Sequence, residues 1–291
     1  MEKSNQQKGA LCILCAALCF ACMSACVRLV GDLPTFEKAF FRNFVAALAA
    51  GFIVRRQKLP LTVAKESRVF VLLRCIFGTC GLLFNFYAID HLNLADANML
   101  NKLSPFFAII FSYFLLKEKV RFVQVLAVIG AFCGALLIIK PGNGLQVFPA
   151  VVGFLGGLGA GAAYTCVRKA TMGGVPSPVI VLYFSLFSCV MCVPLIVTNF
   201  VLPTARQFLF LLLCGTFSAG GQFAITAAYS FAPAKEISVY DYSQVVFSAI
   251  IGFFLFGQVP DAFSIWGYVL IIAMAVLNFV YHNKFEPREN T

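Results

Sequence analysis

The sequence predicts an all-α integral membrane protein in which ten transmembrane helices form two inverted five-helix repeats. Apolar residues make up 61% of the 291-residue chain and charged residues only 12%, a composition that a soluble domain of this size could not shield from water. The first half also returns, shifted by 140 residues and without gaps, as the second half, and Cys26-Val27-Arg28 reappears as Cys166-Val167-Arg168. We therefore divide the chain into a first repeat at 1–140 and a second at 141–291.

Apolar runs of about 20 residues, the length that a helix needs to cross a bilayer, predict the individual spans. Met23-Ser24-Ala25-Cys26 loosely resembles a lipoprotein cleavage box, but cleavage would leave nine spans and break the match between Cys26 and Cys166, so we expect an uncleaved helix. The connections are mostly a few residues long, which leaves no room for an extramembrane domain. The predicted spans are 10–30, 36–54, 69–89, 94–116, 122–139, 148–166, 179–199, 208–231, 237–256 and 263–281.

Basic residues gather in alternate loops, and this pattern predicts the orientation of the chain. The net charge is +10, but its distribution argues against a nucleic-acid partner. The loop after the second span alone carries Arg55, Arg56, Lys58, Lys65 and Arg68. This positive-inside bias predicts that both termini are cytoplasmic. Because each repeat contributes five spans, the two repeats then have opposite orientations.

Small residues in the first and sixth spans predict close helix packing, because residues spaced by four let backbones approach in lipid. A lining that leaves room for a ligand is the alternative interpretation. Pro105 and Pro194 lie inside the fourth and seventh spans, where each predicts a bend. The small residues are Ala17, Ala21 and Ala25 in the first span, and Gly157, Gly161 and Thr165 at the equivalent positions of the sixth.

Twelve cysteines are present, five of them at helical spacing in the first span, but we interpret them as small apolar residues. No histidine cluster accompanies them, so Cys12-x-x-Cys15 and Cys189-x-x-Cys192 are weak metal or redox signals. The sequence therefore predicts no metal and no cofactor.

Charge within a membrane span is costly and usually faces a cavity, and we take four charged residues of the predicted spans as candidates, namely Arg42, Arg74, Lys102 and Asp241. Arg74 lies near the inner end of its span, so we expect it to snorkel to the membrane surface. Arg42 lies deeper, beside Asn43, and is a candidate binding residue. Lys102 and Asp241 are the sharper pair, since the repeat aligns Asn101-Lys102 with Asp241-Tyr242.

Lys102 and Asp241 approach the membrane midplane from opposite sides. In straight helices they would differ in depth by about 10 Å, too far for a direct ion pair unless helices tilt or the lysine reaches. Our hypothesis is that a small zwitterionic or anionic solute lies between them, and the alternative is a buried structural ion pair. Further candidate binding residues are Asn98, Asn101, Tyr87, Gln222, Tyr240, Tyr242 and Gln244.

Several short motifs resemble the EamA family of the drug/metabolite transporter superfamily, and the resemblance covers nearly the whole chain. It implies a ten-helix inverted-repeat carrier with a central cavity that moves metabolites such as amino acids or nucleotide-like compounds. The motifs are Phe40-Phe41-Arg42-Asn43, Leu103-Ser104-Pro105-Phe106-Phe107, Leu115-Leu116-Lys117-Glu118, Tyr240-Asp241-Tyr242 and Phe256-Gly257-Gln258-Val259-Pro260-Asp261.

The stretch from Thr35 to Arg42 is also similar to bacterial S-adenosylmethionine transporters of the same superfamily. One departure concerns the exit of the fourth span in each half, where the family commonly has Gly-Glu. This chain has Lys117-Glu118 in the first half and Gly257-Gln258 in the second. We therefore expect Glu118 to anchor a loop rather than to carry a proton.

The predicted function is secondary transport of a small polar metabolite, amino-acid-like, zwitterionic or nucleotide-like, across a bacterial plasma membrane by alternating access. No P-loop is present, so ATP-driven pumping by this chain is not expected. A proton or ion can be a coupling partner through Asp241, membrane lipid surrounds the protein, and a monomer and a homodimer both fit. Two rival functions are a membrane enzyme using Asp90, His91 and Asp96 on lipid-linked substrates, and a non-transporting scaffold.

Overall fold

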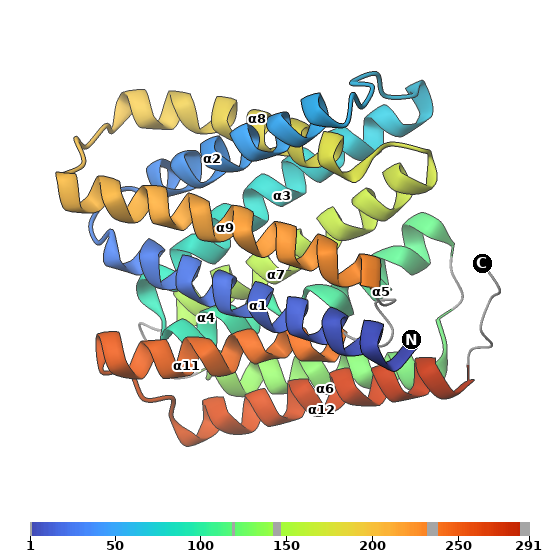
Figure 1. The fold of residues 1–291 in the computed structure, drawn as a ribbon. Coiled ribbons are helices and arrows are strands. Elements are labelled where there is room, and N and C mark those ends of the chain that lie inside the picture. The colour runs from blue at the N-terminus through green and yellow to red at the C-terminus, as the bar shows by residue number, and fades with distance from the viewer. Residues whose placement is uncertain (1, 118–119, 142–146, 232–237, 286–291) are drawn as a thin grey trace.

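A computed structural model describes residues 2–117, 120–141, 147–231 and 238–285, and every regular element in these ranges is helical (Figure 1). The helices lie roughly side by side in one bundle, with short loops at its two ends. The elements are α1 (Glu2–Leu29), α2 (Thr35–Arg56), α3 (Lys65–His91), α4 (Leu94–Asn101), α5 (Ser104–Leu116), α6 (Phe122–Ile139), α7 (Val147–Met172), α8 (Ser177–Thr198), α9 (Ala205–Phe231), the 3₁₀ helix η2 (Ser238–Tyr242), α11 (Ser243–Phe256) and α12 (Ala262–Phe285).

The ten predicted spans are confirmed as ten segments of this bundle. Within the described ranges, nine of them are long and apolar enough to cross a membrane by composition alone. The remaining segment is α2, which carries Glu37, Lys38 and Arg42 as well as two arginines in its last turn. These charges lower its hydropathy, although Glu37 and Lys38 are each only 1% exposed. The protein is therefore a multi-pass membrane protein whose second span is polar inside the bundle.

The fourth and ninth spans are broken, which the sequence analysis did not predict. The fourth consists of α4 and α5, separated at Lys102 and Leu103, and the ninth consists of η2 followed by α11. The repeat shift of 140 residues carries Lys102 onto Tyr242, so both breaks fall at the same position of their repeats. Pro105 does not bend a continuous helix, because it lies in the first turn of α5, where its missing N–H has no helical partner to lose.

Helix packing follows the repeat, because the most extensive contacts join one half to the other. α3 packs along α7 and, equivalently, α9 packs along α1, while α2 meets α8 and α6 meets α12. A methyl group added at Gly81 would come within 2.9 Å of the backbone N of Ala160, and one at Gly221 within 2.8 Å of the ring of Phe20. These two contacts are themselves repeat equivalents. The halves are thus interlocked about an approximate twofold axis, as inverted repeats require.

The C-terminal ends of the broken spans confirm the register of the repeat in backbone geometry. Lys117 ends α5 in a left-handed conformation at φ 55°, and Gly257 ends α11 at φ 63°. The two positions are 140 residues apart. Only the second copy uses glycine, the residue that adopts this conformation without steric cost.

Candidate functional site

A cavity of about 810 Å³ lies at the breaks in the fourth and ninth spans and draws its lining from both repeats. Eight of the ten residues proposed from sequence line it: Lys102, Asp241, Arg42, Asn101, Tyr242, Asn98, Gln222 and Gln244. Tyr87 and Tyr240 do not belong to the lining. Tyr87 stacks on His91 with ring centroids 4.1 Å apart, and Tyr240 is 48% exposed.

Lys102 and Asp241 form a direct ion pair in this cavity, with Lys102 Nζ 2.5 Å from Asp241 Oδ2. From straight helices with a uniform rise per residue, we expected a direct pair only if helices tilt or the lysine reaches. The fourth and ninth spans both leave the α-helical path beside this pair, and α4 packs against α11. The two side chains therefore meet. The second oxygen, Asp241 Oδ1, is buried and has no hydrogen-bond partner among the described residues. This oxygen is therefore a buried acceptor whose hydrogen-bonding capacity is unused among the described residues.

The break beside Lys102 is held by contacts from the second repeat. Tyr242 Oη donates a hydrogen bond to the Lys102 carbonyl at 3.3 Å, which satisfies a backbone acceptor that the interrupted helix leaves free. On α7, a methyl group added at Gly157 would lie 2.5 Å from the Leu100 carbonyl oxygen. A methyl group at Gly161 would lie 2.7 Å from the Ser104 carbonyl oxygen. The small-residue face of the sixth span is therefore a helix-contact face, and its partner is the broken fourth span.

Asn98 lines the cavity but uses its amide to hold three helices together. Its Oδ1 accepts hydrogen bonds from Ser24 Oγ at 3.1 Å and Gln244 Nε2 at 2.9 Å. Its Nδ2 donates to Ser248 Oγ at 3.0 Å and to the Leu94 carbonyl at 2.9 Å. These partners come from α1, α4 and α11. Asn98 therefore holds α4, the helix that precedes Lys102, against α1 and α11.

Arg74 lies in the cavity lining rather than at the membrane surface, so the snorkelling interpretation is wrong. Its Nη1 is 1.9 Å from the position that a Cβ of Gly78 would occupy, which places the guanidinium one turn further along α3. Sequence analysis also left Asn85 and Tyr164 out of the candidate site, although both line the cavity. A glycine four residues after a membrane-embedded arginine was the available signal, because it makes room for that side chain.

The cavity extends toward one end of the bundle. We call this the terminal end, where α1 begins, α7 ends and α12 ends (Figure 1). Ser177 in the first turn of α8 and Phe279 near the end of α12 belong to the lining. The described lining contains no residue from the loops that join α1 to α2 or α8 to α9 at the opposite end. The cavity therefore approaches the surface at the terminal end.

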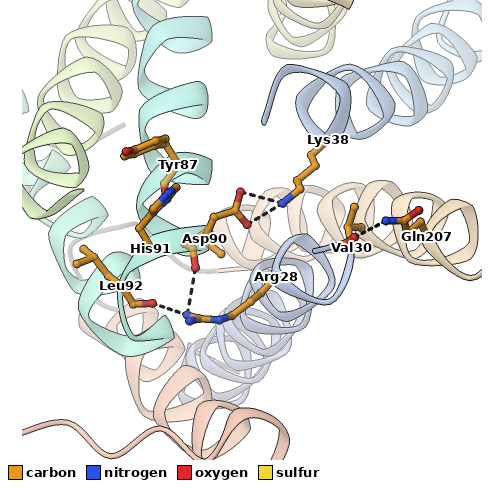
Figure 2. A network of polar contacts seen from close by, with 9 residues as sticks. Arg28, Val30, Lys38, Tyr87, Asp90, His91, Leu92 and Gln207 are labelled. Carbon is orange, nitrogen blue, oxygen red and sulfur yellow. Dashed lines mark hydrogen bonds and ion pairs between the residues drawn. The ribbon is translucent and has the colours of Figure 1, made fainter. Parts of the chain in front are cut away.

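The opposite end is closed by a polar network, shown in Figure 2. Lys38 Nζ donates to both carboxylate oxygens of Asp90 at 2.7 and 2.8 Å, and this lysine is 1% exposed. Arg28 Nη1 donates to the carbonyls of Ile89, at 3.2 Å, and Leu92. These contacts tie together the ends of α1 and α3 and the start of α2.

Further contacts reinforce the same end across the two repeats. Lys140 Nζ lies 2.5 Å from Asp261 Oδ2 and joins the end of α6 to the start of α12. Tyr268 Oη donates to Asp96 Oδ1 at 2.7 Å. Asp90 and Asp96, two of the three residues considered for a membrane enzyme, thus have separate structural partners, while His91 stacks on Tyr87. Asp90 and Asp96 therefore join helices at this end, whereas His91 contacts Tyr87 on its own helix.

Comparison with known proteins decides the family, since the EamA-like transporter family matches residues 7–140 and again 147–280. The chain belongs to the EamA-like transporter family. It is 33% identical over 274 residues to the pseudopaline exporter CntI of Pseudomonas aeruginosa strain UCBPP-PA14, covering 93% of this chain and 95% of that protein. It is 26% identical over 254 residues to the S-adenosylmethionine uptake transporter of Rickettsia bellii strain RML369-C, covering 87% and 86%.

A solved structure shares the overall fold of this chain. A crystal structure described only as that of a protein superposes with a TM-score of 0.67 over 97% of this chain and 99% of its own, at 16% identity. Gln258 follows the C-terminal end of α11, and its Oε1 accepts a hydrogen bond from the Leu94 backbone N at 2.9 Å. Gln258 therefore ties the exit of the ninth span to the entry of the fourth. Glu118, its counterpart in the first repeat, lies outside the described residues.

Proposed function

We propose that this chain is a secondary transporter that moves a small charged metabolite across a bacterial plasma membrane by alternating access. The observation that carries the proposal is the Lys102–Asp241 ion pair, which lies in a large cavity at the point where both repeats break their helices. Discontinuous spans at equivalent positions of inverted repeats expose backbone and polar side chains to a solute near the midplane. Bacterial relatives named as transporters support the membrane assignment.

The two ends of the bundle support a single access state. The cavity reaches toward the terminal end, while ion pairs and hydrogen bonds close the opposite end. With both termini in the cytoplasm, as the positive-inside pattern predicts, this is an inward-facing state. Transport then requires the network around Lys38 and Asp90 to separate when the opposite state forms. The repeats 1–140 and 141–291 would exchange roles in that transition.

Solute flux out of vesicles tests the proposal. The purified protein is reconstituted in liposomes. The liposomes are loaded with pseudopaline, S-adenosylmethionine or a mixture of amino acids, and the exit of each solute is followed with and without a pH gradient. We expect flux of at least one solute, and loss of that flux in Lys102→Met and Asp241→Asn. Arg206→Gln is the control, because it removes one charge that lies outside the cavity and outside the contacts that close the opposite end. Flux of the unsubstituted protein that depends on the pH gradient would support coupling to a proton, and flux that does not depend on it would favour facilitated exchange.

Two results would contradict the proposal. Absence of flux for every solute, with correctly folded protein, would favour the scaffold function. Flux that survives in Lys102→Met, Asp241→Asn and the double variant would show that the ion pair is only structural. The double variant is informative because it removes both charges together and so avoids leaving one of them buried alone.

A further inference from the structure

Arg42 and Arg74 form a second charged group in the cavity, apart from the Lys102–Asp241 pair. Arg42 comes from α2 and Arg74 from α3, and both belong to the lining. Their guanidinium carbons lie 5.9 Å and 4.1 Å from the centroid of the same ring, that of Phe184 on α8. Three helices from two repeats thus bring two cations to one aromatic side chain.

Neither arginine has a carboxylate partner in the described structure. The acids in its ion pairs are Asp90, Asp241 and Asp261, and each of these is held by a lysine. Arg42 is 8% exposed, and its Nη1 donates to Asn43 Oδ1 at 2.6 Å. The Nε atoms of Arg42 and Arg74 are both buried without a hydrogen-bond partner. Buried cations with unused donors are costly, which is the condition under which they are found at sites for anions.

The surroundings hold Arg74 in this position. Any side chain at position 78 would collide with its guanidinium, because the Cβ of an alanine there would lie 1.9 Å from Arg74 Nη1 and 2.9 Å from the ring of Phe184. Gly78 therefore provides the space in which Arg74 turns inward along α3. The repeat offers no copy of this arrangement, since Arg42 aligns with Leu182 and Arg74 with Cys214.

The charges of the cavity do not balance. Among its described lining residues, Arg42, Arg74 and Lys102 are cationic and Asp241 is the one carboxylate, so the ion pair leaves two positive charges uncompensated. Guanidinium groups bind planar oxyanions through two parallel hydrogen bonds, and both arginines keep donors free for this. A solute with a net negative charge would neutralise the site.

We propose that Arg42 and Arg74, with Phe184 between them, form an anion subsite that binds a carboxylate or phosphate of a transported polyanion. This proposal rests on the proposed transport function and names the chemical class of its solute. The Lys102–Asp241 pair then binds a different part of the same solute, a polar group that can include an amine. Arg42 and Arg74 select for net negative charge.

Thermal unfolding of the purified full chain in detergent tests the subsite with defined probes. Citrate and pyrophosphate are titrated separately, against sodium chloride at equal ionic strength. We expect at least one polyanion to raise the unfolding temperature beyond the chloride control. The stronger of the two identifies carboxylate or phosphate as the preferred group. If neither exceeds chloride, the subsite is refuted.

Variants locate the effect. Arg42→Gln and Arg74→Gln should each weaken the polyanion response by about tenfold or more, as expected when one charge-assisted bidentate contact is lost. Gly78→Val should do the same while keeping every charge, because it displaces the Arg74 guanidinium. Arg206→Gln is the matched control, since Arg206 also lies over a phenylalanine, 5.7 Å from the ring centroid of Phe210, but outside the cavity. An unchanged response in the cavity variants would overturn the proposal.

A second readout separates binding from a purely structural role. If Arg74 is an uncompensated buried cation, ligand-free Arg74→Gln should be as stable as the wild-type protein or more stable. If Arg74 has a structural role, the same substitution should lower the unfolding temperature. Vesicle flux separates this proposal from the transport function. Citrate or pyrophosphate binding without flux of any solute would refute transport and leave the subsite standing. Flux that neither polyanion inhibits, and that survives in both arginine variants, would refute only the subsite.

Discussion

Gly157→Ala tests whether the sixth span holds the break in the fourth. The added methyl would lie 2.5 Å from the Leu100 carbonyl oxygen and 3.6 Å from Leu103 Cβ. This oxygen belongs to the backbone of α4, so the steric clash is relieved only if α4, whose C-cap is Lys102, shifts. Overpacking of this kind costs about 1–3 kcal/mol, and the better helix propensity of alanine returns at most about 1 kcal/mol. We expect a net loss of about 1–2 kcal/mol of stability, together with reduced flux.

Gly51→Ala is the matched control for this substitution. The nearest atom to its added methyl is Leu182 Cδ1 at 3.9 Å, an ordinary contact, so the variant should gain about 0.5–1 kcal/mol. Unfolding temperatures in the same detergent should then differ by about 4–8 °C between the two variants. Equal unfolding temperatures, or a more stable Gly157→Ala, would refute the inference that α7 glycines fix the broken helix.

Other predictions concern helix ends and closing contacts. Gly257→Ala should cost about 1–2 kcal/mol, because φ 63° is strained for alanine, whereas Lys117→Gly at φ 55° should stabilise; thermal unfolding measures both signs. Lys38→Met leaves Asp90 unpaired at 17% exposure and should cost about 3 kcal/mol, largely restored by adding Asp90→Asn. Burial raises the pKa of Asp261, but hydrogen bonds from its neighbours outweigh this and lower the pKa below its usual value. The stability that Asp261 adds is therefore present at neutral pH and lost below about pH 4, and acid titration of Asp261→Asn should show a smaller loss.

Hydropathy and the repeat were sufficient to predict the spans and the inversion, and most of the residues proposed from the sequence line the cavity. Apolar length and charge placement are local properties, and they directly reflect the cost of exposing polar groups to lipid. Lys102 and Asp241 stood out for the same reason. The break beside Lys102 was not predicted because no glycine or proline marks it, and Pro105 follows it inside the next helix.

The break depends on tertiary partners that a single segment does not reveal. Tyr242 supplies the hydrogen bond to the Lys102 carbonyl, and Gly157 supplies the space, both from the second repeat. The position of Arg74 was missed for a similar reason. Its inward turn requires Gly78 on its own helix, which the sequence shows, and Phe184 on α8, which only the fold brings close.

The interlocking of the repeats has a consequence for how the protein is made. α1 packs chiefly along α9, and Lys102 pairs with Asp241, so the first five spans enter the membrane before their main partners exist. At ribosomal rates of about 5–20 residues per second, Asp241 is synthesised on the order of 10 s after Lys102. During this interval the charge of Lys102 and the polar residues of α2 are in the membrane without their partners from the second repeat. The order of synthesis therefore adds a cost to polar residues in the first repeat that the finished fold no longer shows.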